Sequence, residues 1–182
     1  MNHRKIPEEQ ENPIDNLIID LAQKLNPYFY KLKLTPNILT TISLLLGIIA
    51  SILIYNKKYY LASLLFFISY MFDCFDGNMA RTYNMVSDFG DMYDHLSDLI
   101  KIIFFIYIIF ISKHIKNKKK IILIYILIIF GTLMLWHLGC QEKQYKNQKN
   151  SNKSVLNNFE FLCTNKNNIN ISRYFGCATL VL

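Results

Sequence analysis

Four long runs rich in apolar residues divide the chain, and short polar stretches separate them. The runs cover about residues 38–55, 59–80, 86–112 and 121–138. A helix needs about 20 predominantly apolar residues to cross the roughly 30 Å hydrocarbon core of a bilayer, and each run approaches or exceeds that length. The pattern therefore predicts an all-α polytopic membrane protein, a transmembrane helix bundle with about four complete spans.

A shorter segment, residues 13–33, precedes the first run and carries apolar residues at helical spacing. Asn12 and Pro13 suit the cap and the first position of a helix. The segment is too polar to cross a membrane, so we expect an amphipathic interfacial helix that ends at Pro27, with aromatic residues following at headgroup depth. Packing on another protein domain is the alternative. Residues 1–12 lack the apolar core of a signal peptide, and we expect them to be disordered.

The segment after the fourth run, residues 141–182, is polar and rich in Asn and Lys up to about residue 172 and then turns apolar again. We expect a loop or a poorly ordered segment, followed by the start of a partial fifth span. Residues 34–140 then form the transmembrane core. Because the chain stops as the last apolar stretch begins, we interpret it as a fragment or a shortened variant.

Charge and cysteine content narrow the choice of partners. The formal charge is +7, but the lysines are dispersed through short loops between apolar runs, where water and anionic lipid headgroups are the simplest partners. Membrane lipid is therefore expected as a partner and nucleic acid is not. The four cysteines form no CxxC pair and no zinc-type spacing with histidine, so free thiols are expected.

Two pairs of carboxylates, Asp73 with Asp76 and Asp94 with Asp98, lie inside the apolar runs. A carboxylate at the centre of a lipid-facing helix costs about 2.5–3.5 kcal/mol, so these groups should meet something cationic. Each pair shares one face of a helix, and two such helices side by side would bring four carboxylates together. Oxygen ligands without Cys or His favour Mg²⁺ or Mn²⁺ over Zn²⁺.

These carboxylates belong to a longer pattern, DxxDGxxARx₈GxxxDxxxD, with eight constrained positions. The matching residues are Asp73, Asp76, Gly77, Ala80, Arg81, Gly90, Asp94 and Asp98. The pattern resembles the signature of the class-I CDP-alcohol phosphatidyltransferase family. The resemblance implies an enzyme of phospholipid biosynthesis that moves a phosphatidyl or phosphobase group from a CDP-linked donor to an acceptor hydroxyl and releases CMP. Members commonly have six transmembrane helices, more than this chain supplies.

The resemblance also implies roles for the matching residues. The expected ligands of Mg²⁺ or Mn²⁺ are Asp73, Asp76, Asp94 and Asp98. The expected donor-binding residues are Gly77, Ala80, Arg81 and Gly90. Asp98 would also act as the base that takes the acceptor proton. Arg81 can form two parallel hydrogen bonds to phosphate oxygens. The three small residues would leave room for cytidine and diphosphate; ordinary helix packing is the alternative for them.

The donor and the acceptor alcohol stay open at this stage. CDP-diacylglycerol, CDP-choline and CDP-ethanolamine are all candidate donors. His95 directly follows Asp94, and the resulting sequence is similar to the DHxxD of choline and ethanolamine phosphotransferases, which favours those two bases and a diacylglycerol acceptor. The family topology implies an active site that faces the cytoplasm, although the lysines of residues 113–120 oppose it under the positive-inside rule. Similar proteins commonly form homodimers.

Two other functions compete with this interpretation. A divalent-cation transporter would also carry carboxylates inside the membrane, but transport does not account for Arg81 or for the three small residues beside them. A truncated, non-catalytic relative that binds nucleotide or a full-length partner is the second alternative, and the abrupt C-terminus supports it.

Overall fold

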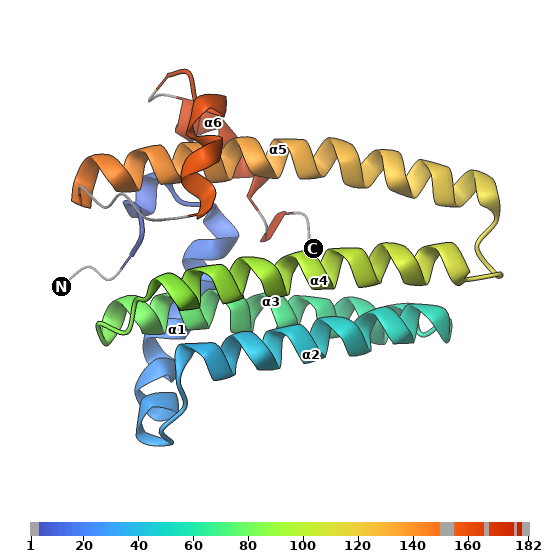
Figure 1. Cartoon of the computed structure of the whole chain (residues 1–182), viewed down its shortest axis with the longest axis horizontal. Coiled ribbons are helices and arrows are strands. Elements are labelled where there is room, and N and C mark those ends of the chain that lie inside the picture. Colours follow the sequence, from blue (N-terminus) through green and yellow to red (C-terminus); the bar gives the residue numbers. More distant parts are fainter. Residues whose placement is uncertain (1–3, 150–154, 166–167, 177, 180–182) are drawn as a thin grey trace.

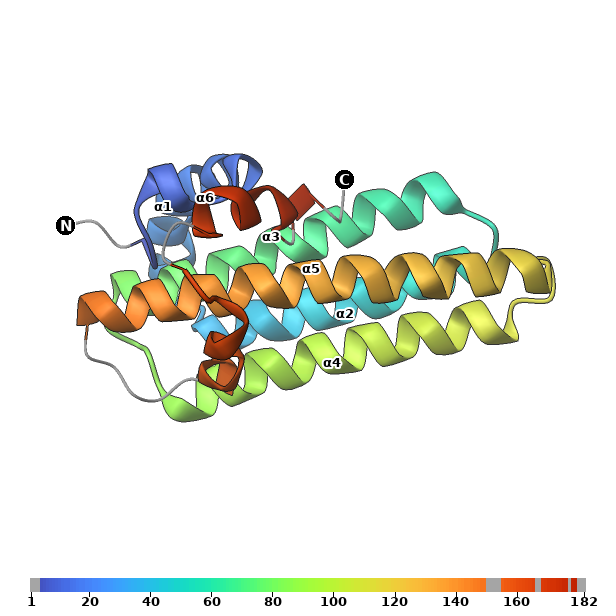
Figure 2. The same ribbon diagram turned by 90° about the horizontal axis from the view of Figure 1, so that it is seen from above.

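The computed structural model describes residues 4–149, 155–165, 168–176 and 178–179, and all regular structure in these residues is helical. The α-helices are α1 (Pro13–Lys31), α2 (Pro36–Tyr55), α3 (Tyr59–Thr82), α4 (Asp88–Ile111), α5 (Asn117–Lys149) and α6 (Ile169–Ser172). The 3-10 turns are η1 (Glu8–Gln10), η2 (Val155–Leu162) and η4 (Arg173–Phe175). Helices α2, α3, α4 and α5 run along one another, and α1 lies across them at one end (Figures 1 and 2). The all-α bundle is therefore confirmed.

Helices α2, α3 and α5 are long and apolar enough to cross a membrane by length and composition, over Pro36–Tyr55, Tyr59–Thr82 and Asn117–Gln144. The third expected span, residues 86–112, corresponds to α4, which is 24 residues long. Its Asp94 lies beside Asp73 and Asp76 of α3, and its Lys101 contacts both α2 and α3, whereas apolar residues such as Phe110 stay exposed. Among the residues that the structure describes, three of the four helices α2 to α5 thus meet the apolar criterion.

Helix α1 starts where the sequence predicts, because the Asn12 side chain accepts a 2.9 Å hydrogen bond from the amide of Ile14. The predicted end at Pro27 is wrong, since the helix continues to Lys31 with the proline inside it. A proline removes one backbone donor from a helix. Contacts with α3 on both sides of Pro27 offset the loss of this hydrogen bond. Before the proline, the Asn26 side chain donates a hydrogen bond to the carbonyl of Phe75 on α3. After it, the Phe29 ring packs against the Phe75 ring.

The N-terminal segment also differs from the expectation of disorder, in the part that the structure describes. Ile6 is buried against Cys140, Cys163 and Ile169, in a small apolar cluster separate from the main core. Lys5 forms an ion pair with Glu142 on α5. Residues 5 and 6, just before α1, thus contact the C-terminal half of α5, which no local sequence pattern predicts.

The polar segment after the fourth apolar run was expected to be a loop or a poorly ordered segment, but α5 covers its first part up to Lys149, and η2 packs against the same helix. This hairpin brings Cys140 and Cys163 together in a disulfide, so the prediction of free thiols is wrong for this pair. Cys177 lies outside the described residues. Where a partial fifth span was expected, from about residue 173, the structure describes residues 173–176 and 178–179, of which Arg173–Phe175 form η4.

Candidate functional site

A cavity of about 400 Å³ lies among the N-terminal ends of α1, α2 and α4, the C-terminal half of α3, and α5. Its volume suits a small-molecule substrate or cofactor. All eight residues of the sequence pattern line it, namely Asp73, Asp76, Gly77, Ala80, Arg81, Gly90, Asp94 and Asp98. The structure therefore brings the whole pattern to one cavity. The sequence predicts this for the carboxylates, because each pair shares one face of a helix and the two helices were expected to lie side by side.

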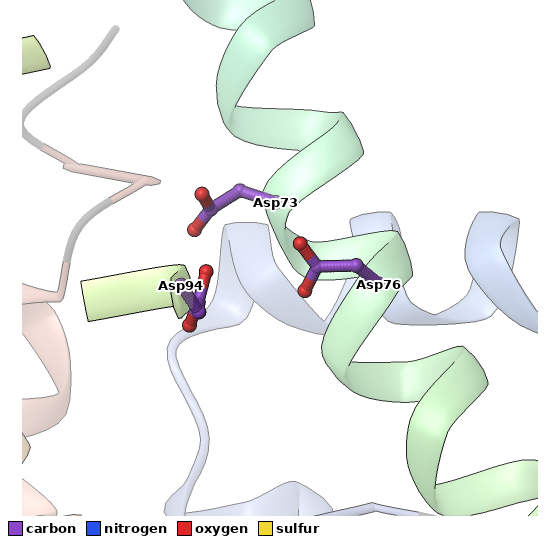
Figure 3. A group of neighbouring side chains, drawn as sticks. All are labelled: Asp73, Asp76 and Asp94. Atoms are coloured by element: carbon purple, nitrogen blue, oxygen red, sulfur yellow. The ribbon is translucent and has the colours of Figure 1, made fainter. Parts of the chain in front are cut away.

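Three of the four carboxylates form a tight group. Asp73, Asp76 and Asp94 each place one carboxylate oxygen within 4.8 Å of the others. Figure 3 shows the two α3 carboxylates turned to the same side, toward Asp94 on α4. The spacing of three residues between Asp73 and Asp76 puts both on one face of α3, and the packing of α4 supplies the third.

The surroundings of these carboxylates fit a hard divalent cation. Asp76 is only 4% exposed and accepts a 2.6 Å hydrogen bond from the hydroxyl of Thr40. One carboxylate oxygen of Asp94 is buried and has no hydrogen-bond partner among the described residues. A buried acceptor without a partner is costly, and a bound cation would satisfy it. The ligand atoms of the group are all oxygens, which Mg²⁺ and Mn²⁺ prefer.

The small residues shape the cavity around Arg81. A Cβ atom at Gly77 would lie 3.3 Å from the Arg81 Nη1 atom, so the guanidinium folds back along α3 over this glycine. At the start of α4, Ser87 caps the helix by accepting a 3.0 Å hydrogen bond from the amide of Gly90. A Cβ at Gly90 would crowd that hydroxyl at 3.1 Å. Both glycines thus preserve local contacts as well as space.

Comparison with known proteins decides the family. The sequence model described as CDP-alcohol phosphatidyltransferase matches residues 33–156, which is more than half of the chain. The chain belongs to the CDP-alcohol phosphatidyltransferase family. Members of this family transfer a phosphoalcohol group from a CDP-alcohol donor, so membership supports a transferase activity. No curated protein and no solved structure matches the chain.

The fourth carboxylate of the family pattern has a different partner. Asp98 lies outside the group of three, and its Oδ1 atom is 2.7 Å from the ammonium of Lys101, one turn further along α4. The same ammonium lies 2.9 Å from Asp73 Oδ1. Lys101 was not among the predicted site residues. The signal that would have found it was the spacing of three residues from Asp98, together with the need of an intramembrane carboxylate for a cation.

His95, which suggested a choline or ethanolamine donor, lines the cavity but turns toward its own helix. Its Nδ1 atom lies 2.7 Å from the carbonyl oxygen of Asp91 and 3.9 Å from the nearest carboxylate oxygen of Asp94. The histidine therefore makes no hydrogen bond to the family carboxylate that precedes it.

A second polar group lines the same cavity, and sequence analysis missed it. Gln141 on α5 donates a 2.7 Å hydrogen bond to Glu11, and Tyr70 on α3 donates one of 2.5 Å to Asp15 on α1. Burial raises the pKa of Glu11, and it raises the pKa of Asp15 to about 7, with the Tyr70 hydrogen bond opposing the shift. His137 also lines the cavity and is buried. These residues lie far apart in the sequence, so only the fold brings them together.

Proposed function

We propose that this chain transfers a phosphatidyl or phosphobase group from a CDP-linked donor to an acceptor hydroxyl, with release of CMP, in phospholipid biosynthesis. Family membership supports the reaction class. The observation that carries the proposal is the convergence of three carboxylates on a cavity that also holds Arg81 and Asp98. A cavity built for cation transport alone would have no use for a guanidinium beside the carboxylates.

Asp73, Asp76 and Asp94 are the proposed ligands of Mg²⁺ or Mn²⁺, and Asp98 lines the same cavity outside this group. A divalent cation held there would neutralise diphosphate charge and would stabilise the leaving CMP. One of these ligands, Asp76, is held in place by a hydrogen bond that the Thr40 hydroxyl donates to its carboxylate. Such supporting hydrogen bonds orient ligands and tune metal affinity.

Arg81 is the proposed contact for the donor phosphates, because its guanidinium can donate two parallel hydrogen bonds to phosphate oxygens. It lines the cavity one turn from Gly77, whose missing side chain leaves the guanidinium room. Gly77, Ala80 and Gly90 would then accommodate the cytidine and the diphosphate.

Asp98 is the proposed base. Its side chain is 48% exposed, so an acceptor hydroxyl can reach it from the cavity. As the new bond forms between the acceptor oxygen and the attacked phosphorus, the bond from that phosphorus to the CMP oxygen breaks, and the acceptor proton passes to Asp98.

The finer assignments remain part of the proposal. The candidate donors are CDP-diacylglycerol, CDP-choline and CDP-ethanolamine, and the acceptor is a small alcohol or diacylglycerol. We further propose that the cavity faces the cytoplasm, that the chain is a multi-pass membrane protein, and that two copies form a homodimer, as in similar proteins.

The proposal is tested by CMP release from the purified full chain in detergent. Each donor is combined with a panel of acceptors and with Mg²⁺ or Mn²⁺. We expect metal-dependent CMP release that needs one acceptor, that Asp98→Asn abolishes, and that the exposed variant Asp20→Asn retains. Silence across the panel, or equal turnover in Asp98→Asn, would contradict the proposal and favour a non-catalytic relative. Uptake of Mn²⁺ into vesicles that contain the protein would instead favour transport.

A further inference from the structure

The ammonium of Lys101 on α4 contacts three polar groups at the carboxylate site. It lies 2.7 Å from Asp98 Oδ1, 2.9 Å from Asp73 Oδ1 and 3.0 Å from the Ser43 hydroxyl on α2. The side chain is only 13% exposed. Lys101 lies three residues beyond Asp98, the last residue of the family pattern.

The path of the Lys101 side chain is built into α2. A Cβ atom at Gly47 would lie 2.9 Å from Lys101 Cδ and 3.0 Å from Cγ, closer than side-chain packing allows. Ser43, one turn before this glycine on the same face of α2, supplies the hydroxyl that contacts the ammonium. Two positions of α2 thus accommodate the lysine, one with space for its stem and one with a contact for its head.

The ammonium lies between Asp73 and Asp98, two carboxylates that could also hold a second divalent cation. Phosphoryl-transfer sites often hold two cations about 3.5–4 Å apart. With the first cation in the group of Asp73, Asp76 and Asp94, the second would have to bind between Asp73 and Asp98. Mg²⁺ binds carboxylate oxygens at about 2.0–2.1 Å, and Lys101 already contacts one oxygen of each of these two carboxylates.

We propose that Lys101 takes the place of a second divalent cation, so that the site binds one divalent cation at Asp73, Asp76 and Asp94 and keeps a permanent ammonium between Asp73 and Asp98. The inference rests on the proposed function, because it concerns the same metal site. Lys101 is then a positioning residue for Asp98: its ion pair fixes the carboxylate that faces the acceptor hydroxyl.

The number of bound Mn²⁺ ions per chain tests this inference. The purified full chain in detergent is titrated with Mn²⁺, and free Mn²⁺ is followed by electron paramagnetic resonance. We expect about one ion per wild-type chain, about two in Lys101→Met, and about one in Lys24→Met, which removes an exposed lysine from α1. Asp94→Asn should abolish the single wild-type ion.

Two ions per wild-type chain would overturn the inference, and so would a count that stays at one in a folded Lys101→Met protein. Gly47→Ala provides a second variant that keeps the lysine but pushes its stem aside, and it should also admit additional Mn²⁺. If Lys101→Met does not fold, the wild-type and Gly47→Ala counts decide the question.

The same samples separate this inference from the proposed function when CMP release is measured on them. One bound Mn²⁺ without CMP release contradicts the proposed function and leaves the inference standing. Metal-dependent CMP release with two bound ions supports the proposed function and contradicts the inference.

Discussion

Thr40 on α2 donates a 2.6 Å hydrogen bond to Asp76 on α3, and both side chains are nearly fully buried. The hydroxyl holds one of the three clustered carboxylates from a neighbouring helix. A carboxylate that binds a metal depends on such a partner for its orientation. The packing of α2 against α3 should therefore influence how tightly the proposed site binds a cation.

Thr40→Val should weaken Mn²⁺ binding by about 10- to 100-fold, the usual effect of losing a hydrogen bond to a metal ligand. Valine keeps the shape of threonine, so the packing of α2 changes little. Titration of the purified protein with Mn²⁺ measures the effect. Thr41→Val is the matched control, because the neighbouring hydroxyl contacts Tyr93 and not a carboxylate of the group. Equal affinities in both variants would contradict the role of Thr40.

Arg81→Lys should reduce kcat/KM for the CDP-linked donor by about 10- to 100-fold, because a hydrogen bond to a charged group contributes roughly 1.5–3 kcal/mol and lysine cannot form the paired contact. The charge is kept, so long-range attraction of the donor is unchanged. CMP-release kinetics at varied donor concentration measure the effect. Arg4→Lys is the control, since Arg4 pairs with Asp20 away from the carboxylate group. Unchanged kinetics would exclude Arg81 as a bidentate phosphate contact.

Stability should fall as pH rises from about 4 to about 7, in part because of Asp15. Burial raises the pKa of this carboxyl to about 7, so in that window the folded protein holds a proton that the unfolded chain has released. Each such group contributes at most about 1.4 kcal/mol of loss per pH unit. Thermal unfolding in detergent at several pH values should show a flatter profile for Asp15→Asn. The exposed variant Asp20→Asn should keep the wild-type profile, and identical profiles in all three proteins would contradict this prediction.

Loss of the disulfide should loosen η2 from α5 and lower the thermal midpoint, since the bridge between Cys140 and Cys163 closes a loop between them. A disulfide typically contributes about 2–4 kcal/mol. Reductant should lower the midpoint of the wild-type protein and leave Cys163→Ser unaffected. An equal response of both proteins would show that the bridge does not stabilise the fold.

The same pair of cysteines tests the proposed orientation. The cytosol keeps thiols reduced, so a bridge at the cavity end of the bundle should form only after isolation if that end faces the cytoplasm. Blocking of thiols in intact cells before lysis should therefore label both Cys140 and Cys163. Protection of both residues in the cell would contradict the cytoplasmic orientation.

Much of the site follows from the sequence because helical periodicity is local. Asp73 and Asp76 share a face of α3 whatever surrounds them, and the same holds for Asp94 and Asp98 on α4. The structure places all four on one cavity. Helix ends were less predictable: the expected stop at Pro27 failed because contacts with α3 hold the helix on both sides of the proline.

The sequence by itself determined the all-α membrane bundle, the family and the eight residues of the carboxylate pattern, because apolar length and helical spacing need only neighbours in the chain. Tertiary structure decided which groups meet across helices. It set Lys101 between Asp73 and Asp98, placed Gly47 beside its stem, and joined Glu11 to Gln141. These contacts depend on how helices that are far apart in the sequence pack together, and a local sequence pattern does not determine packing geometry.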